Sequence, residues 1–411
     1  MFASTLAPAR NASRPLAVIA VVLLAVNLRA SISSAAALLD SLALQQGLTA
    51  LTASLITTIP LLAFAVGGAL TVRVVARFGV ERTVVGALVA LTIGLAARGV
   101  PQSWALLTGT TIGMLGLAMC NVALPAFIRA AFPARIGLLT SVYTTAMAAG
   151  ATIAAASAVP IAVIVASPNA ALASWALPAA LAAAAWLPLA VRSGRAPKPG
   201  AQHAAVTLAD VARTRFGRLI TAYFAVQALN CYVMIGWLPS ILVSAGFDQA
   251  FAGLLLAVMQ GVGIPMTFLI LGFTSSATRT RIAFTAVSAC TLAGFAGLLL
   301  APAPGALVWS LLIGIGLCSF PLILASISRS SASAAEVTAV SALAQSVGYA
   351  MAAAGSLGFG LLHAATGGWT MPLLALIGLA VIQLTLGLAF TKPSTRRQQG
   401  APSGSRDQRS S

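Results

Sequence analysis

The chain has 411 residues, of which 59% are hydrophobic and only 7% are charged, and it carries a formal net charge of +17 at pH 7. A soluble globular protein has about 25% charged residues, so this composition excludes a soluble protein. Apolar runs long enough to cross a hydrocarbon core as a helix recur along the chain, and the mean hydropathy is +0.99. The chain is therefore predicted to be embedded in a membrane.

The positive charge does not indicate a nucleic-acid-binding protein. Basic residues form short clusters between the apolar runs rather than one patch, as cytoplasmic loops require. The four cysteines fall inside apolar runs without CxxC or Cys/His spacing, and we interpret them as packing residues. The sequence contains no metal-ligand cluster and no nucleotide-binding loop, so we expect neither a metal nor a cofactor.

The first apolar run, 15–38, is too long for a signal peptide and leads directly into further spans, which predicts a first transmembrane helix. Five more predicted helices precede a polar stretch: 49–72, 81–99, 103–127, 136–165 and 172–191. Six follow it: 217–243, 249–273, 281–301, 304–326, 335–364 and 370–391. The segments 136–165 and 335–364 could each contain a kink or end early. The sequence thus predicts an all-α membrane protein with twelve transmembrane helices.

The positive-inside rule then predicts that both termini are cytoplasmic. With this orientation, all but two of the 23 basic residues lie in inner loops or at the termini. The exceptions are Arg98, which falls on the outer side at the end of the third predicted helix, and Arg29, inside the first span. A different number of helices would scramble this sorting. We therefore predict a multi-pass protein of the inner (plasma) membrane.

A polar segment rich in Pro, Gly and Arg, residues 192–216, predicts a cytoplasmic linker with a short amphipathic helix at 206–215. It divides the chain into two predicted six-helix bundles, an N-terminal one at 1–191 and a C-terminal one at 217–391. Residues 392–411 have the composition of a disordered cytoplasmic tail.

The two halves resemble each other at an offset near 200 residues. Matching positions are Asn27 and Asn230, Pro60 and Pro265, Gly116 and Gly316, Pro125 and Pro321, and Arg129 and Arg329. Together these matches predict a parallel internal repeat, in which an axis along the membrane normal relates the two bundles.

Arg29 is a charge inside a predicted span, about 21 Å along a helix that begins near Pro15. An ionised arginine at this depth costs several kcal/mol and must face a partner, a cavity or a ligand. None of the six acids lies at comparable depth: Asp40, Glu81, Asp210, Asp248, Glu336 and Asp407. Two interpretations stay open: solvation by water and neutral acceptors, or binding of an anion or strongly polar group in a central cavity.

Other polar residues inside the spans are candidate neighbours of Arg29: Asn27, Asn121, Tyr143, Gln227, Asn230, Tyr232, Gln260, Gln345 and Tyr349. For any single one, bridging between helices is at least as common a role as ligand contact. As a set they avoid the third, sixth, ninth and twelfth predicted helices, which favours a wet central cavity. Gly261, Gly263 and Pro265 are predicted to loosen the eighth helix, and Pro239 the outer end of the seventh.

Ordered sequence blocks occur in both halves, among them NLRASIS, ARFGVERT and NVALPAFIRAAFPARIGLLTSVYTTA, then VQALNCYVMIGWLPSIL, FPLILASISRS and AQSVGYAMAAAG. These blocks resemble the cyanate and 2-nitroimidazole permease family of the major facilitator superfamily. The resemblance implies a two-bundle fold, alternating access and a small substrate, often anionic or a polar heterocycle. The family arginine carries over to Arg29, and the family's amide and aromatic positions to Gln227, Tyr232, Gln345 and Tyr349.

The sequence departs from this family in three places. Ala30 follows the arginine where proline is typical, and Ser356 stands where a Gly-Pro pair is usual. The acidic position of the loop between the second and third helices is Ala76. The predicted gating residues of this loop are then Arg73, Arg77, Gly79 and Arg82, with Glu81 as a possible substitute acid.

The predicted function is secondary active or facilitative transport of a small polar or anionic solute, cyanate- or nitroimidazole-like. The two halves are expected to rock around a central site built from Arg29 with Asn27, Tyr143, Gln227, Tyr232, Gln260, Gln345 and Tyr349. Coupling stays open among uniport, exchange, and a proton carried by Asp40 or by the substrate. The expected partners are the solute and the lipid bilayer, without nucleic acid, and the expected state is a monomer.

Two other functions are considered. A multidrug or metabolite exporter of the same fold would be favoured by a large uncharged cavity, and Arg29 argues against it. An intramembrane enzyme is a third candidate, for which Ser356 and His363 would be the superficial pair. They lie seven residues apart on one predicted helix, which does not supply the geometry of a nucleophile and its base. The chain is therefore predicted not to be an enzyme.

Overall fold

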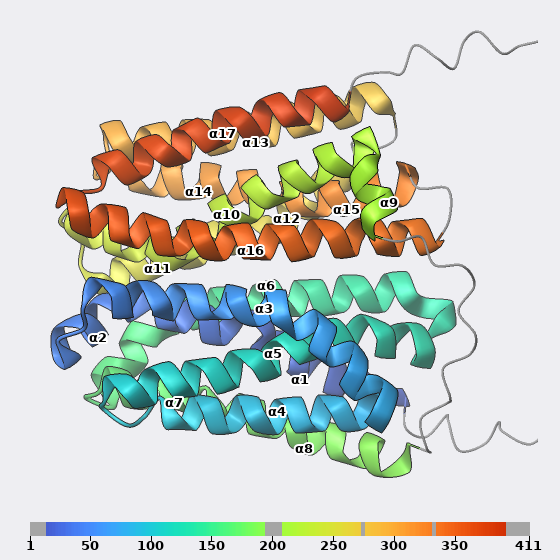
Figure 1. Cartoon of the computed structure of the whole chain (residues 1–411). Coiled ribbons are helices and arrows are strands. Elements are labelled where there is room, and N and C mark those ends of the chain that lie inside the picture. The colour runs from blue at the N-terminus through green and yellow to red at the C-terminus, as the bar shows by residue number, and fades with distance from the viewer. Residues whose placement is uncertain (1–13, 194–207, 273–275, 331–333, 392–411) are drawn as a thin grey trace, which may run out of the picture.

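The computed structural model describes residues 14–193, 208–272, 276–330 and 334–391, and these residues are almost entirely helical (Figure 1). Within them, twelve helices are long and apolar enough to cross a membrane, which confirms the predicted number. Helices are the expected outcome because hydrocarbon offers no hydrogen-bond partners, so every backbone N–H and C=O must be satisfied within its own segment.

Six spans form the first half of the chain. They are α1 (Arg14–Ala37), α3 (Ala50–Phe78), α4 (Val80–Ala97), α5 (Ser103–Ala131), α6 (Ile136–Ile164), and α7 (Pro168–Ser174) continued by α8 (Ala176–Arg192). The short helix α2 (Leu39–Gln46) follows α1, and the 3₁₀ turn η1 (Pro133–Arg135) precedes α6.

Six spans form the second half, after the short helix α9 (Leu208–Arg213). They are α10 (Arg215–Ser244), α11 (Gln249–Gly261) continued by α12 (Gly263–Gly272), α13 (Ala277–Leu300), α14 (Ala306–Leu317) continued by α15 (Ser319–Ser330), α16 (Ala334–Thr366) and α17 (Thr370–Phe390). Helix α9 lies inside the predicted amphipathic segment. Most of the predicted linker and all of the predicted tail lie outside the described residues.

Helix breaks occur in part where proline requires them. Proline has no N–H, and its ring clashes with the carbonyl four residues earlier. Pro265 accordingly follows the end of α11 at Gly261, as the sequence predicts, and Pro321 follows the end of α14 at Leu317, which was not predicted. Helix α10 continues through Pro239, and α6 and α16 run without a break, so the possible early ends of these two spans do not occur.

The helices gather into two bundles, one for each half of the chain (Figure 1). In the first, α1 packs on α6 and α8, and α4 packs on α5; in the second, α10 packs on α16 and α17, and α13 packs on α14. The bundles meet mainly through α3 with α16 and α6 with α11.

The predicted repeat has a structural counterpart in helix contacts that recur 200 residues apart. A Cβ added at Gly94 of α4 would overlap the backbone of Gly113 on α5, and one added at Gly294 of α13 would overlap Ile313 on α14. Close approach of two helices needs such small residues because any side chain would separate the backbones.

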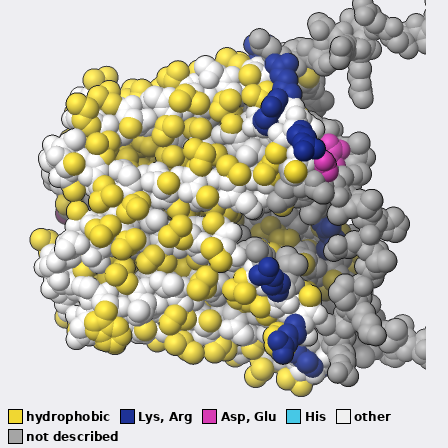
Figure 2. Space-filling view, in the orientation of Figure 1, with side chains coloured by type: hydrophobic (Ala, Val, Ile, Leu, Met, Phe, Trp, Pro, Cys, Tyr) yellow, Lys and Arg dark blue, Asp and Glu magenta, His cyan; other side chains and the backbone are white. Residues whose placement is uncertain are grey.

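The two ends of the molecule differ in charge. Arginine side chains gather at one end, called here the basic end, where α1 begins and α17 ends (Figures 1 and 2). The described members of this group are Arg73, Arg77, Arg82, Arg129, Arg135, Arg192, Arg213, Arg215, Arg218, Arg279 and Arg281. The surface between the two bundles is hollowed toward this end in Figure 2.

At the opposite end, called here the far end, the two halves are joined by hydrogen bonds. Ser33 donates to Gln260 Oε1 (3.0 Å), Ser240 to Asp40 Oδ1 (2.8 Å), and Ser356 to Thr57 Oγ1 (3.0 Å). Gln249 of α11 bridges in the same way, donating to the carbonyl of Ala37 (3.0 Å) and accepting from Ser41. The described protein is therefore closed at the far end.

Substitution of Gly94 by alanine is expected to destabilise the protein. The added methyl group must push α4 away from α5, and overpacking of this kind typically costs about 1–3 kcal/mol. The measurement is thermal unfolding of the purified protein in detergent. Gly86→Ala is the matched control on the same helix, because no atom lies within 4 Å of its added Cβ. Equal loss of stability in both variants would contradict the close packing of α4 on α5.

Candidate functional site

Arg29 lies in the middle of α1 and reaches the aromatic side chains of the other half. Its guanidinium carbon lies 5.9 Å from the ring centroid of Tyr232 on α10, within the range of a cation–π interaction. The guanidinium also interacts with the hydroxyl of Tyr232 and with Tyr349 of α16. Phe64 of α3 completes the group, with its ring centroid 5.3 Å from that of Tyr349 and 6.4 Å from that of Tyr232. The structure thus brings Arg29, Tyr232 and Tyr349 together, and Phe64 is a neighbour that sequence reasoning missed.

The chemistry of this group, called here the central site, is that of a cation among neutral partners. In the described part of the chain, Arg29 interacts with Tyr232, Tyr349 and Cys231, and no carboxylate is among its partners. A guanidinium has five N–H donors in a planar fork, more than two tyrosines can use. Because Arg29 is half-buried rather than sealed, its remaining donors can serve an anion or a strongly polar group.

Two of the predicted site residues, Asn27 and Gln227, form hydrogen bonds within their own bundles instead of reaching Arg29. Asn27 donates to the carbonyls of Leu23 (2.8 Å) and Pro178 (3.1 Å), and so ties α1 to α8. In the second half, Asn230 ties α10 to α17 by donating to Gln383 (2.9 Å), and Gln227 accepts from the same side chain (2.6 Å). The two asparagines therefore make equivalent contacts in the two halves, in agreement with the predicted repeat.

Gln383 also corrects the expectation that the last span contains no embedded polar residue. It is fully buried on α17 and connects Asn230, Gln227 and the hydroxyl of Tyr223 (3.3 Å). The sequence could have indicated this role, because Gln383 is the one amide inside the apolar run 370–391. Buried amides on neighbouring helices satisfy one another, which explains why this polar cluster is compatible with hydrocarbon on the outside.

The other predicted site residues occupy different positions. Gln260 lies in the far-end contact with Ser33, and its Nε2 is buried and has no hydrogen-bond partner among the described residues. Tyr143 on α6 and Gln345 on α16 are half-buried, and their contact with a solute stays a prediction.

The predicted gating residues lie at the basic end. Arg73, Arg77 and Arg82 are exposed; Arg77 stacks on the ring of Phe78 (5.3 Å), and Arg82 donates to the carbonyl of Ser193 (3.5 Å). Gly79 has a φ of +86°, a conformation that strongly favours glycine and allows the sharp turn between α3 and α4. Their role in gating stays a prediction.

Arg98 is the second arginine inside the protein, although the sequence placed it on the outer side, at the end of the third predicted helix. It is only 1% exposed at the end of α4. Its Nε donates to Thr110 Oγ1 of α5 (3.1 Å), and one terminal nitrogen donates to the carbonyl of Ser31 on α1 (3.1 Å). The loop after Arg98 is held separately by Asn169, which donates to the Arg98 carbonyl (2.8 Å). The sequence did not predict this burial, because a basic residue at the end of a predicted span is usually exposed to solvent.

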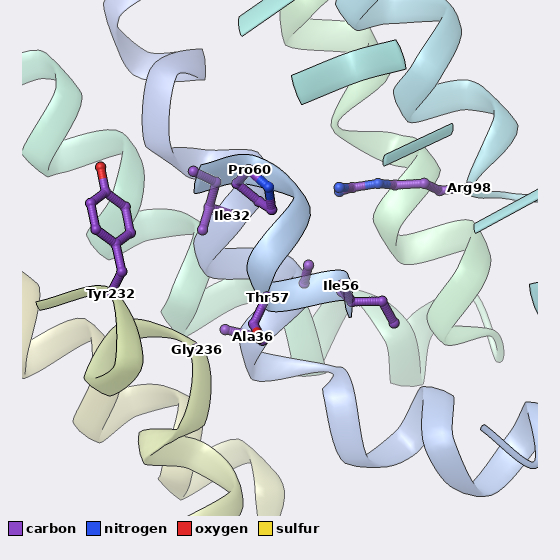
Figure 3. Close-up of a pocket in the computed structure, with 9 residues that line it drawn as sticks. Ile32, Ala36, Ile56, Thr57, Pro60, Arg98, Tyr232 and Gly236 are labelled. Carbon is purple, nitrogen blue, oxygen red and sulfur yellow. The ribbon is translucent and has the colours of Figure 1, made fainter. Parts of the chain in front are cut away.

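Arg98 lines a small cavity between the two halves, on the far-end side of Tyr232 (Figure 3). Its volume is about 10 Å³, roughly the space of one water molecule. Ile32 and Ala36 of α1 and Thr57 of α3 line it from the first half, and Tyr232 and Gly236 of α10 line it from the second. In Figure 3, Arg98 reaches toward α1 and α3 from one side while α10 lies on the other.

Ser356 and His363 do not form a catalytic pair. The Ser356 hydroxyl donates across the bundles to Thr57, and the His363 ring stacks on Trp369 with centroids 3.6 Å apart. The departure from the family's Gly-Pro pair thus supplies a hydrogen bond to the far-end contact.

Asp40 is the acidic residue at the far-end contact. One oxygen accepts from Ser240, while Oδ2 is buried and has no hydrogen-bond partner among the described residues. Burial raises the pKa of the Asp40 carboxyl above its ordinary range, and the Ser240 hydrogen bond and the charge of His363 oppose this rise. Of the other helices near α2, neither α7 nor α11 contains a titratable side chain, and Asp248, before α11, accepts from its own helix at Phe251 N.

Comparisons with known proteins agree with this architecture. The family model of the Major Facilitator Superfamily matches residues 19–356. The chain is 33% identical over 375 residues to a 2-nitroimidazole transporter of Escherichia coli (strain K12), covering 90% of this chain and 93% of that protein. It is 25% identical over 372 residues to the cyanate transport protein of the same organism, covering 88% of this chain and 95% of that protein.

Solved structures share the fold at low sequence identity. A bacterial homolog of the human lysosomal transporter Spinster, in an inward-facing and unoccupied conformation, has a TM-score of 0.74 at 13% identity, over 94% of this chain and 98% of that one. The xylose transporter of E. coli in an inward-open conformation has a TM-score of 0.69 at 15% identity, over 93% of this chain and 97% of that one.

The chain belongs to the Major Facilitator Superfamily. It is a multi-pass membrane transporter and not an enzyme, and the resemblance to the cyanate and 2-nitroimidazole permeases is confirmed.

The far-end contact is expected to respond to pH through Asp40. When the far end is closed, the raised pKa means that the carboxyl binds a proton more tightly than it would in water. Lowering the pH toward this pKa therefore favours closure, and raising the pH above it disfavours closure because a charged carboxylate must then be buried. Electron spin resonance distances between labels at Leu44 and Ala365, exposed on α2 and α16, should show a larger closed fraction as the pH falls.

Two variants sharpen this measurement. Asp40→Asn should remove the pH response. Ser240→Ala should move its midpoint to higher pH, because it removes a hydrogen bond that stabilises the carboxylate. A response that survives Asp40→Asn would assign the titration to another group and contradict this prediction.

Proposed function

We propose that this transporter carries a small polar or anionic solute, cyanate- or nitroimidazole-like, across the inner membrane and binds it at the central site. The single observation that supports this proposal most is Arg29, a half-buried guanidinium in mid-span whose described partners are neutral. Such a cation is costly in a membrane protein unless it faces a cavity, a partner or a ligand.

The surroundings of Arg29 favour a small and flat ligand. The rings of Phe64, Tyr232 and Tyr349 offer apolar faces to a heterocycle, while the guanidinium offers directed donors to a nitro group, a ring nitrogen or an anion. The names of the two relatives, a 2-nitroimidazole transporter and a cyanate transport protein, describe solutes of this kind. An exporter of large apolar compounds would gain nothing from a buried cation, so we do not favour this alternative.

The proposed mechanism is alternating access by rocking of the two bundles. The central site draws Arg29 and Phe64 from the first half and Tyr232 and Tyr349 from the second, so a bound solute would contact both halves. From the positive-inside rule we infer that the basic end faces the cytoplasm. The described conformation is then open to the cytoplasm, and breaking the far-end hydrogen bonds would open the opposite side.

Replacement of Arg29 is expected to weaken solute binding at the central site. A hydrogen bond to a charged group contributes about 1.5–3 kcal/mol, so Arg29→Gln should weaken apparent affinity roughly 10- to 100-fold. The measurement is counterflow of labelled cyanate and of 2-nitroimidazole in proteoliposomes, which does not depend on the coupling ion. Arg29→Lys should retain part of the cyanate activity, because it keeps the charge but not the planar fork.

Arg135→Gln is the matched control, because it removes the same charge from an exposed position at the basic end. It should behave as the wild type. Wild-type counterflow in Arg29→Gln, with the protein folded and inserted, would overturn the central site as the binding site. Absence of counterflow for both solutes in the wild type would overturn the proposed solute class.

A further inference from the structure

We propose that Arg98 is a second anion-binding residue of the transport path, and that the cavity beside it is the closed remnant of a vestibule that leads from the far end to Arg29. This inference rests on the proposed function for the direction of the path. This second site is indicated by the free-energy cost of burying the Arg98 charge and not by the family resemblance.

The cavity occupies a position on the path rather than inside one bundle. It is bounded by α1 and α3 of the first half and by α10 of the second. Along α1, Ile32 and Ala36 follow Arg29 by three and seven residues, which places the cavity about 5–10 Å beyond Arg29 toward the far end. Tyr232 takes part in both sites: the Arg29 guanidinium lies over its ring, and Tyr232 also lines the cavity. Tyr232 therefore belongs to both the central site and the cavity wall.

The charge of Arg98 has no structural explanation among its partners. Its hydrogen bonds go to a threonine hydroxyl and a backbone carbonyl, both of which a neutral donor would satisfy. Asn169, not the Arg98 side chain, holds the loop that follows. Burial lowers the pKa of Arg98 to about 10, so it stays protonated near neutral pH. A buried charge is expected to have a partner, and an anion in the vestibule would be one.

Opening of the far end would join this cavity to the outside. At present it has room for roughly one water molecule, too little for a solute of several atoms. The contacts that close it are short polar ones: Ser356 donates to Thr57, which also lines the cavity, and Ser33 donates to Gln260. When these separate, Arg98 would present a positive charge to solutes that enter from the far end, before they reach Arg29.

A thiol-labelling experiment tests this without knowledge of the natural solute. Ala36→Cys places a thiol in the cavity wall, opposite Gly236 of the other half. Anionic and cationic methanethiosulfonate reagents of similar size are applied from the far-end face, and each rate is divided by its rate with a free thiol in solution. We expect the anionic reagent to react several-fold faster than the cationic one, because a nearby positive charge concentrates anions. The ratio should fall several-fold in Arg98→Gln and stay high in Arg98→Lys.

Control variants separate charge from structure. Thr110→Val removes a hydrogen bond of Arg98 without changing any charge, and it should leave the ratio unchanged. The parent protein with its native thiols gives the background; of these, Cys120, Cys231 and Cys318 are buried. An equal ratio with arginine and glutamine at position 98 would overturn the proposal, and so would complete protection of Ala36→Cys from the far-end face.

A transport measurement distinguishes this proposal from the central-site proposal. Arg98→Gln should raise the KM for cyanate several-fold from the far-end side, whereas Arg29→Gln should weaken the apparent affinity roughly 10- to 100-fold from either side. Weakened affinity in Arg29→Gln with an unchanged KM in Arg98→Gln would overturn the vestibule site and leave the central site standing. A charge-dependent labelling ratio in a protein that carries neither cyanate nor 2-nitroimidazole would support the vestibule site and overturn the proposed solute class.

Discussion

A guanidinium held inside an apolar bundle without a carboxylate beside it is the constraint on which the function of this protein depends. Arg29 cannot lose its proton at any relevant pH, and it cannot remain among hydrocarbon chains without acceptors. The fold meets this constraint by placing Arg29 where the two halves face each other, so that water, a solute or the tyrosines of the second half can reach it. The same position makes the cation available to whatever passes between the halves.

Polar side chains elsewhere serve two separate purposes. Asn27, Asn230 and Gln383 connect helices within a bundle, and each bundle is thereby fixed as a unit. Ser33, Ser240 and Ser356 connect the bundles to each other at the far end. Each such hydrogen bond contributes only about 0.5–1.5 kcal/mol net, so this contact can close firmly and still reopen. Rigid bundles joined by a separable contact are what rocking of two halves requires.

The number of spans, the distribution of basic residues and the identity of Arg29 as an intramembrane charge could all be predicted from the sequence. Hydrocarbon forces helices of a fixed minimum length, and apolar runs of that length are visible in one dimension. The internal repeat was also visible, and the equivalent contacts of Asn27 and Asn230 agree with it. What a linear pattern records is the depth of each residue in the membrane.

Only the tertiary structure decided which neighbour each polar residue meets, because rotation about a helix axis depends on long-range packing. Asn27 and Arg29 are two residues apart, so they point about 200° apart around α1, one toward α8 and the other toward the second half. Asn230 and Tyr232 on α10 differ in the same way. Arg98 was misplaced for a related reason: it follows the last residue of α4, and the sequence cannot show that its side chain folds back between α1 and α5. Depth and charge were therefore determined by the sequence, and direction by the fold.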